Sequence, residues 1–275
     1  RVRAGFAELI SRSLMERGDG SWSMHRMTAA ALRHLQAKRD DVDTARAAAA
    51  LLAAVYPQDP NMSSTWPLCA RLSPHVRALW ASGAALETEA LDYLLGQTAV
   101  YLDKIADFPG GLEMDRASFA LTQKRLPEEH RHIAVGYANL GIALMKAGEL
   151  EEAEAHLARA VELQETHRPE SLDLAESYNL HGRVFFARAR AGDAEALVKS
   201  IKRHQQALAL YRRLAGRDSE ASARALNNLA LSRDTQGRAA AAARLYAASL
   251  AICRRVLDPG DANLANSLMN TGAAW

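Results

Sequence analysis

The sequence predicts an all-α chain in which pairs of antiparallel helices repeat and stack into a solenoid. Residues 134–163 read as two amphipathic helices that fold back on each other at Ala147-Gly148. In each helix, apolar residues recur at the spacing that lines one face. Gly148 suits the left-handed conformation that often ends a helix. Neither helix can bury its apolar face alone, so we expect neighbouring pairs to cover it.

The same pattern returns further along the chain at steps of 41, 89 and 131 residues from Ala134. Self-similarity at such a period is the sequence signature of a helical repeat array. The matched positions are Ala134, Ala175, Ala223 and Ala265; Tyr137 and Tyr178; Leu140 and Leu229; Gly141 and Gly182; Gly148 and Gly237; and Asn228 and Asn270.

The first helix contains the Leu140-Gly141 pair, and the second carries Ala153 and Ala160 around Leu157. This arrangement resembles the tetratricopeptide repeat, and the period near 42 residues resembles its kinesin-light-chain-like variety rather than the usual repeat of about 34. The resemblance implies a right-handed superhelical solenoid of helix pairs. We assign the tetratricopeptide repeats to residues 129–275, with the last repeat truncated.

Composition agrees with close helix packing, because the hydrophobic content of 49% is mostly Ala and Leu. The net charge of +2 argues against bulk attraction to nucleic acid or to an anionic membrane. Cys69 and Cys253 lack ligand-like spacing, and the longest apolar stretch, 45–56, is shorter than the roughly 18 residues of a membrane span. No signal peptide is recognisable. We therefore expect a cytoplasmic protein with no membrane contact.

Residues 1–38 predict a helix, a turn at Gly18-Asp19-Gly20, a short strand at Ser21–Ser23 and a second helix from His25. This order suggests the C-terminal part of a winged-helix-like domain. A winged helix can bind DNA, with scattered arginines as candidate phosphate contacts, but no basic recognition stripe follows. Nucleic-acid binding is therefore disfavoured.

The run Ser23-Met24-His25-Arg26-Met27 resembles the end of the NB-ARC module in bacterial STAND-class NTPases, which carries a Met-His-Asp motif. In that family the histidine approaches the phosphates of ADP, which implies a nucleotide-sensing role for His25. Arg26 departs from the motif's Asp, and the alternative is a locally hydrogen-bonded histidine at a helix start. The Walker motifs do not occur in this chain. ATP or ADP is therefore expected only if an NTPase domain precedes Arg1, and otherwise no cofactor.

A helical linker is expected at residues 39–84. It comprises a helix over 41–56, a loop over 61–67 and a further helix that starts at Ser73-Pro74. Residues 85–128 read as a degenerate first repeat, with helices at 86–102 and 112–126 joined by a link at 107–111. The chain starts without Met and stops after the first helix of a repeat, so we expect it to be a fragment of a longer protein.

The second full repeat is about six residues longer than its neighbours, and the extra residues fall within 187–199. We expect both of its helices to be lengthened at their hinge. His181 and His204 stand where the preceding repeat has Leu140 and Leu157. They are interpreted as hydrogen-bonded core histidines, with a polar switch as the alternative.

In such a solenoid the first helix of each pair lines the concave face, where partners dock. Asn side chains can pair with the backbone of an extended peptide, and arginines favour an acidic segment or a terminal carboxylate. The predicted partner-binding groove consists of Asn139, Asn179, Arg183, Arg224, Asn227, Asn228, Asn266 and Asn270. The alternative role of these asparagines is to bond the neighbouring repeat.

An apolar groove is predicted in the first full repeat, formed by Val135, Ala138, Ile142 and Met145. No catalytic residue is predicted, because Asp92, Glu113 and His156 fall on unrelated faces and no nucleophile–base spacing occurs. No metal site is predicted either, since the neighbouring His130 and His132 have no third ligand.

The favoured function is a non-catalytic protein or peptide recognition module, the sensor and regulatory region of a STAND-type signalling NTPase. Any ATPase activity would lie in a missing N-terminal region, and the resemblance leaves oligomerisation on activation open. The first alternative is a free-standing tetratricopeptide scaffold that assembles other proteins. The second is a winged-helix DNA-binding regulator with a repeat sensor domain.

Overall fold

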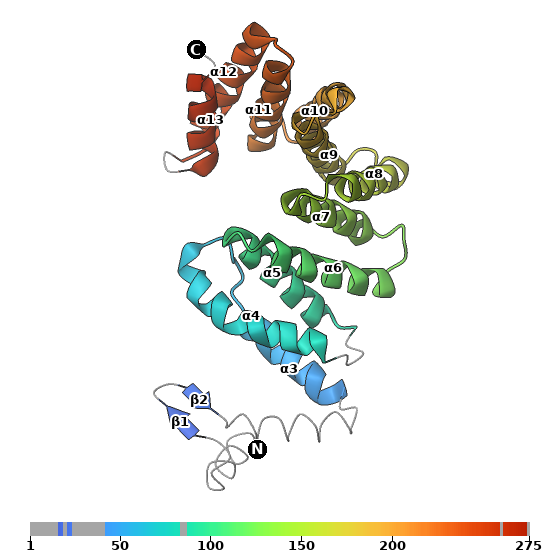
Figure 1. Cartoon of the computed structure of the whole chain (residues 1–275), viewed down its shortest axis with the longest axis vertical. Helices are drawn as coiled ribbons and strands as arrows, with labels where there is room; N and C mark the ends of the chain where they lie inside the picture. Colours follow the sequence, from blue (N-terminus) through green and yellow to red (C-terminus); the bar gives the residue numbers. More distant parts are fainter. Residues whose placement is uncertain (1–15, 19–20, 24–41, 83–86, 259–260, 274–275) are drawn as a thin grey trace.

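A stack of helix pairs makes up most of the computed structural model, which describes residues 16–18, 21–23, 42–82, 87–258 and 261–273 (Figure 1). A short hairpin of β1 (Glu16–Gly18) and β2 (Ser21–Ser23) precedes it. The helices are α3 (Val42–Val55), η1 (Ser63–Thr65), α4 (Trp66–Ala81), α5 (Glu89–Lys104), α6 (Phe108–Arg125), α7 (Arg131–Ala147), α8 (Leu150–His167), α9 (Leu172–Arg190), α10 (Ala194–Leu214), α11 (Glu220–Thr235), α12 (Ala239–Val256) and α13 (Ala262–Ala273).

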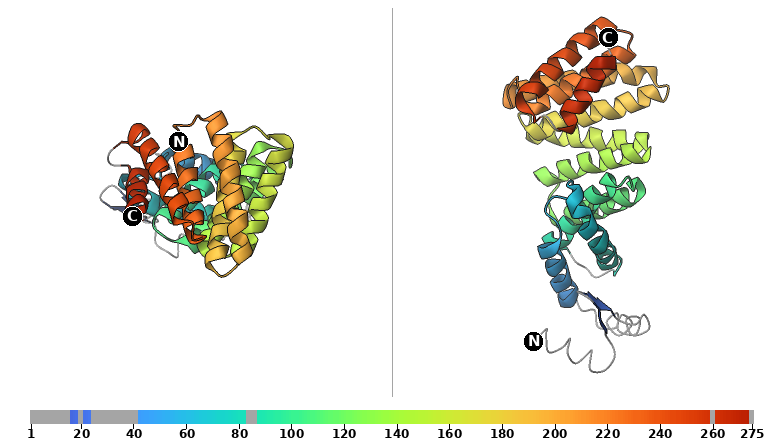
Figure 2. Two further views of the ribbon diagram at one scale, coloured as in Figure 1. Left: turned by 90° about the horizontal axis from the view of Figure 1, so that it is seen from above. Right: turned by 90° about the vertical axis from the view of Figure 1, so that its left-hand side faces the viewer.

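The helices form an open solenoid, as predicted. Each helix from α5 onward packs against the next, and α7, α9, α11 and α13 also contact one another in turn. These first helices of successive pairs therefore line the inner side of the stack. The direction of the helices turns along the long axis, as the three views show together (Figures 1 and 2). None of the helices in the described ranges has the length and apolar character needed to cross a membrane.

Hinges and caps follow the local sequence. The predicted hinge between α7 and α8 is confirmed, since Gly148 has φ 88° and its N–H bonds the carbonyls of Leu144 and Met145. Ser171, Asp193 and Ser219 each accept a backbone N–H at the start of α9, α10 and α11. Single capping residues in the sequence therefore mark these helix boundaries.

The longer second repeat is also confirmed. The helices α9 and α10 have 19 and 21 residues, against 17 and 18 for α7 and α8. Gly192, with φ 110°, forms the hinge inside the predicted insertion. Both helices absorb the extra residues, so the pair stays antiparallel.

Two predicted boundaries are wrong. The helix expected to start at Ser73-Pro74 begins at Trp66, with Pro67 in its first turn, and Pro74 lies inside it. The Ser73 hydroxyl does not cap a helix start but donates to the carbonyl of Cys69 at 2.7 Å. The expected link at 107–111 is mostly helical, because Asp107 caps α6 by accepting the Gly110 N–H.

The predicted strand at Ser21–Ser23 is present and pairs antiparallel with Glu16–Gly18. The helices expected on either side of this hairpin, and His25 with them, lie outside the described residues. The winged-helix interpretation of residues 1–38 therefore stays a prediction.

The first and second full pairs, α7–α8 and α9–α10, are interlocked where a side chain of the second helix fills the space over a glycine of the first. A Cβ at Gly141 would lie 2.6 Å from Cγ of Leu157, and a Cβ at Gly182 would lie 2.6 Å from Cε1 of His204. The two contacts are equivalent in the first and second full repeats. His204 therefore occupies the core position of a leucine.

The two core histidines are buried, as predicted, but they do not form the predicted hydrogen bonds with described residues. His181 and His204 are 2% and 1% exposed, and Nδ1 of both and Nε2 of His181 have no hydrogen-bond partner among the described residues. His181 stacks on Phe185 with ring centroids 4.4 Å apart. Burial lowers the pKa of each imidazole to about 3, with nearby cationic side chains acting in the same direction.

We expect His204→Leu to raise the free energy of unfolding by an amount that grows as the pH falls. An unfolded histidine titrates near pH 6.5, so between pH 6.5 and 3 the unfolded wild type binds a proton that the folded chain excludes. Below pH 6 the difference from wild type should therefore increase by about 1.4 kcal/mol per pH unit. Urea unfolding at several pH values measures it.

The matched control is His75→Leu, which makes the same change at an exposed site on α4. This control should show no comparable pH-dependent gain. Equal pH profiles for His204→Leu and wild type would show that the His204 imidazole is protonated as readily in the fold as in the unfolded chain.

Candidate functional site

A polar cavity of about 350 Å³ opens between α9, α11, α12 and α13. It brings together six of the eight predicted groove residues, although they come from three helices. These six are Asn179, Arg183, Arg224, Asn227, Asn228 and Asn266. The helical register of successive first helices places them on one side of the stack, as the repeat pattern predicted.

Four of the asparagines bond each other across neighbouring repeats. Nδ2 of Asn228 donates to Oδ1 of Asn179 at 2.9 Å, and Nδ2 of Asn270 donates to Oδ1 of Asn227 at 2.9 Å. Asn179 is only 1% exposed, so the prediction that its amide reaches a peptide is not met. The amide pairs instead join α9 to α11 and α11 to α13, which is the alternative role considered above.

Arg224 is held by an ion pair within the wall of the cavity. Its Nη2 lies 2.7 Å from Oε2 of Glu176, and the Tyr211 hydroxyl donates to the same carboxylate oxygen. Burial, together with the Glu176 charge, raises the pKa of the Tyr211 hydroxyl above its usual range. Arg224 therefore crosslinks α9 and α11 and is only partly free to bind a ligand.

Arg183 differs from Arg224 in having no hydrogen bond or close ion pair in the part of the chain that the structure describes. Its side chain is half-buried and lines the cavity. Burial lowers the pKa of its guanidinium, the Glu176 charge opposes this, and the positive charge of Arg224 adds to it. A desolvated cation beside a second cation would gain from an incoming carboxylate.

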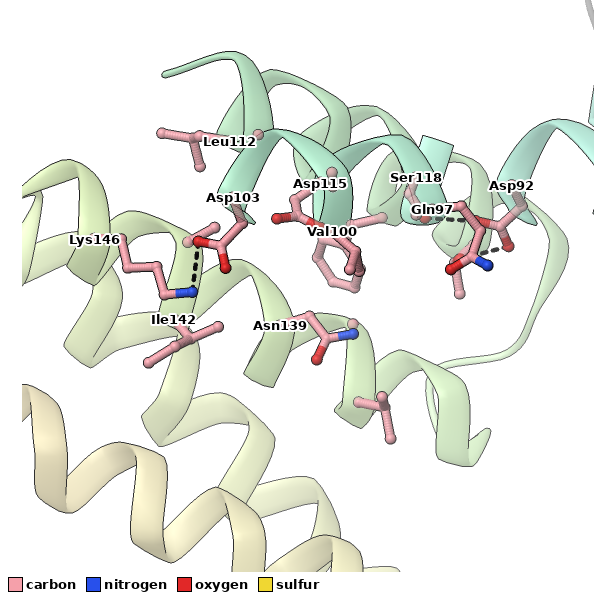
Figure 3. Close-up of a pocket in the computed structure, with 18 of the residues that line it drawn as sticks. Asp92, Gln97, Val100, Asp103, Leu112, Asp115, Ser118, Asn139, Ile142 and Lys146 are labelled. Atoms are coloured by element: carbon pink, nitrogen blue, oxygen red, sulfur yellow. Dashed lines mark hydrogen bonds and ion pairs between the residues drawn. The ribbon is translucent and has the colours of Figure 1, made fainter. Parts of the chain in front are cut away.

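A larger cavity, of about 560 Å³, lies between α5, α6 and α7; we call it the α5–α7 cavity (Figure 3). Three residues that were predicted to line a groove, Val135, Asn139 and Ile142, line this cavity. Ala138 is instead buried at 6% exposure, and Met145 packs against the hydrophobic core of α7 and α8.

The predicted apolar groove stays a prediction, and charged side chains line the same cavity as Val135 and Ile142. Nζ of Lys146 lies 2.6 Å from Oδ1 of Asp103, and Asp115 projects beside them (Figure 3). The apolar pattern of α7 alone does not show which side chains of α5 and α6 face it. The acidic residues come from α5 and α6.

Sequence reasoning missed these charged residues, although the chain contained a signal for some of them. Asp103 and Lys146 are opposite charges 43 residues apart, which is one repeat. Arg131 and Asp173, 42 residues apart, form the same kind of contact with an N–O distance of 2.9 Å. Opposite charges at the repeat period thus mark contacts between neighbouring pairs.

Comparison with known proteins assigns the repeats to a class. The model of the tetratricopeptide repeat family matches residues 132–200 and 197–255. These residues are therefore tetratricopeptide repeats, which act generally as protein-interaction modules. A search of curated protein sequences finds no match for the chain.

Solved structures similar to this chain include kinesin-light-chain repeats. BtubC (BKLC) from P. vanneervenii is 20% identical with a TM-score of 0.56, over 85% of this chain and 83% of that one. One structure of a Podosopora anserina putative kinesin light chain with nearly identical TPR-like repeats is 19% identical with a TM-score of 0.59, over 78% and 96%. At these sequence identities, the similarity shows a shared fold and nothing more.

We expect Asn228→Ala to destabilise the chain although the residue lines a cavity. The substitution leaves Oδ1 of the buried Asn179 without its donor, which costs about 1–3 kcal/mol. Urea unfolding followed by far-UV circular dichroism measures the loss. Asn266→Ala is the matched control, because Asn266 is exposed and should change stability by less than about 0.5 kcal/mol. Equal losses for both variants would contradict a structural role for the amide pair.

Proposed function

We propose that this chain is a recognition module that holds an extended acidic peptide of a partner protein against the inner side of α9, α11 and α13. The observation that carries the proposal is Arg183, a half-buried cation in the polar cavity that forms no hydrogen bond or ion pair with a described residue, although the charge of Glu176 acts on it. A carboxylate from outside would supply the missing partner. Charge-assisted hydrogen bonds to arginine are among the stronger polar contacts.

The rest of the cavity supports binding of a peptide backbone next to that charge. Asn266 is exposed, and Asn227 and Asn270 are partly exposed, so their amides can still meet a backbone N–H or C=O. The paired asparagines and Arg224 hold the helices at a fixed spacing. A preformed groove lowers the ordering cost of binding.

We further propose that the module is the sensor region of a STAND-type signalling NTPase, in which capture of the peptide biases a preceding winged helix. The Met24-His25 resemblance and the β1–β2 hairpin support this proposal. A free-standing scaffold is equally compatible with the tetratricopeptide repeats. The gene sequence upstream of Arg1 distinguishes them, since only the sensor requires a GxxxxGK[ST] stretch there.

We expect Arg183→Gln to weaken binding of acidic peptides at least tenfold. An array of acidic peptides, with matched peptides in which Asp and Glu become Asn and Gln, supplies the ligands. Losing one charge-assisted contact of about 1.5–3 kcal/mol corresponds to a tenfold or larger change in Kd. Fluorescence anisotropy on the best-binding peptide measures it.

Arg190→Gln is the matched control, because Arg190 is an exposed arginine near the end of the same helix. It removes the same charge and should change the affinity less than twofold at moderate ionic strength. Equal weakening of peptide binding by both variants would show that only the net charge of the chain matters, and not the position of Arg183. Unchanged binding by Arg183→Gln would remove Arg183 from the site.

A further inference from the structure

The α5–α7 cavity lies where the degenerate first repeat meets the first full one. A Cβ at Gly96 of α5 would meet nothing within 4 Å, whereas Gly141 and Gly182 are covered by Leu157 and His204. Gly96 lines the cavity, whose volume of about 560 Å³ falls in the range of small-molecule sites, roughly 300–1,000 Å³. The degenerate repeat at Gly96 is thus more open than the first and second full pairs are at Gly141 and Gly182.

The cavity wall combines apolar surface with a few polar groups. Val100, Leu112 and Ile142 provide apolar surface from α5, α6 and α7, and Asp115 and Asn139 lie among them (Figure 3). This combination is typical of sites that hold an apolar ligand body and orient one polar end.

The carboxyl groups in this cavity differ in whether they have a hydrogen-bond or ion-pair partner. Asp103 pairs with Lys146 at 2.6 Å. Asp92 accepts from Ser118 at 2.6 Å and from Thr122 at 3.1 Å. Asp115 has no hydrogen bond or close ion pair in the described parts of the chain.

Burial and the neighbouring Asp103 charge raise the pKa of Asp115 to about 7, against the opposing charge of Lys146. The positive charge of Lys146 therefore does not offset burial and the Asp103 charge at this carboxyl. An entering cation would meet a carboxylate that the protein leaves unpaired.

We propose that the α5–α7 cavity binds an organic cation, an ammonium or guanidinium group on an apolar stem, with the cation at Asp115 and the stem against Val100, Leu112 and Ile142. Free amines and basic side chains of a partner share this chemistry. The site is independent of the polar cavity at α9–α13, which is proposed to take a ligand of the opposite charge.

The test uses isothermal titration of the whole chain with 4-phenylbutylamine, its uncharged analogue 4-phenylbutanol, and a peptide with one lysine between leucines. We expect the amine or the lysine peptide to bind and the alcohol to bind at least tenfold more weakly. Binding of the amine alone indicates a small-molecule ligand, and binding of the peptide indicates a partner's side chain. Binding by none of the cationic probes would overturn the proposal.

Asp115→Asn should abolish the preference for the amine over the alcohol. The substitution keeps the shape of the side chain and removes a carboxylate that is costly to bury, so the variant should fold at least as well as wild type. Glu113→Gln is the matched control, since Glu113 is exposed on the same helix. A cation preference that survives Asp115→Asn would overturn the proposal.

Gly96→Leu tests the cavity rather than the charge. A leucine there should project into the open space and block binding of both amine and alcohol without disturbing the helix. Gly272→Leu, at another helical glycine whose Cβ would meet nothing within 4 Å, should leave binding unchanged. Full affinity in Gly96→Leu would place the ligand elsewhere and contradict the proposal.

Proton release provides an independent readout. The other titratable residues that line the cavity are Asp92, Asp103 and Lys104 of α5 and His132 and Lys146 of α7, and the charges of Asp103 and Lys146 act on Asp115. A bound cation should ionise Asp115, so titrations at pH 7 in two buffers of different ionisation enthalpy should reveal release of a fraction of a proton. This release should disappear in Asp115→Asn, which retains all the other groups. Release of the same size in the variant would contradict the assignment.

Discussion

The structure depends on how closely the two helices of a pair approach each other. At Gly141 and Gly182 there is no room for a Cβ, because Leu157 and His204 of the partner helix occupy that space. Such contacts fix the rotation and the separation of the helices. The fixed pairs then stack through α7, α9, α11 and α13, which form the inner side. The position of every groove residue follows from that stacking.

Departures from this packing give the chain its distinctive properties. In the second full repeat, a histidine fills the leucine position, and an imidazole buried without partners opposes folding once the pH falls below its usual pKa. In the degenerate repeat, Gly96 is left uncovered and a cavity opens beside Asp115. The raised pKa of Asp115 acts in the opposite direction. The unfolded carboxyl loses its proton from about pH 4, whereas the half-buried folded one keeps it up to about pH 7, so stability falls as the pH rises through this range. The histidines and Asp115 therefore partly cancel in the pH dependence of the whole chain.

Local signals predicted most of the fold. The hinge at Gly148 and the long pair α9–α10 needed only glycine positions and the repeat period. Predicted helix boundaries were wrong where a residue type occurs both at helix starts and within helices. Ser73-Pro74 predicts a helix start, but the helix begins earlier, at Trp66, and continues through Pro74.

The candidate sites were harder to predict because they depend on which side chains bond each other. The repeat pattern placed the asparagines on the inner side but could not distinguish Asn179, buried in an amide pair, from the exposed Asn266. It could not separate Arg224, paired with Glu176 across the insertion, from Arg183. The α5–α7 cavity was missed because its wall comes from three helices, and the periodicity of a single helix does not show which side chains of the others face it.

The central claim is that an acidic peptide lies along the inner side at α9, α11 and α13. Hydrogen–deuterium exchange of the chain with and without the best-binding acidic peptide tests this claim most directly. The account predicts slower exchange in the peptic fragments of α9, α11 and α13, with α8 and α10 unchanged. Protection confined to α8 and α10 would contradict it.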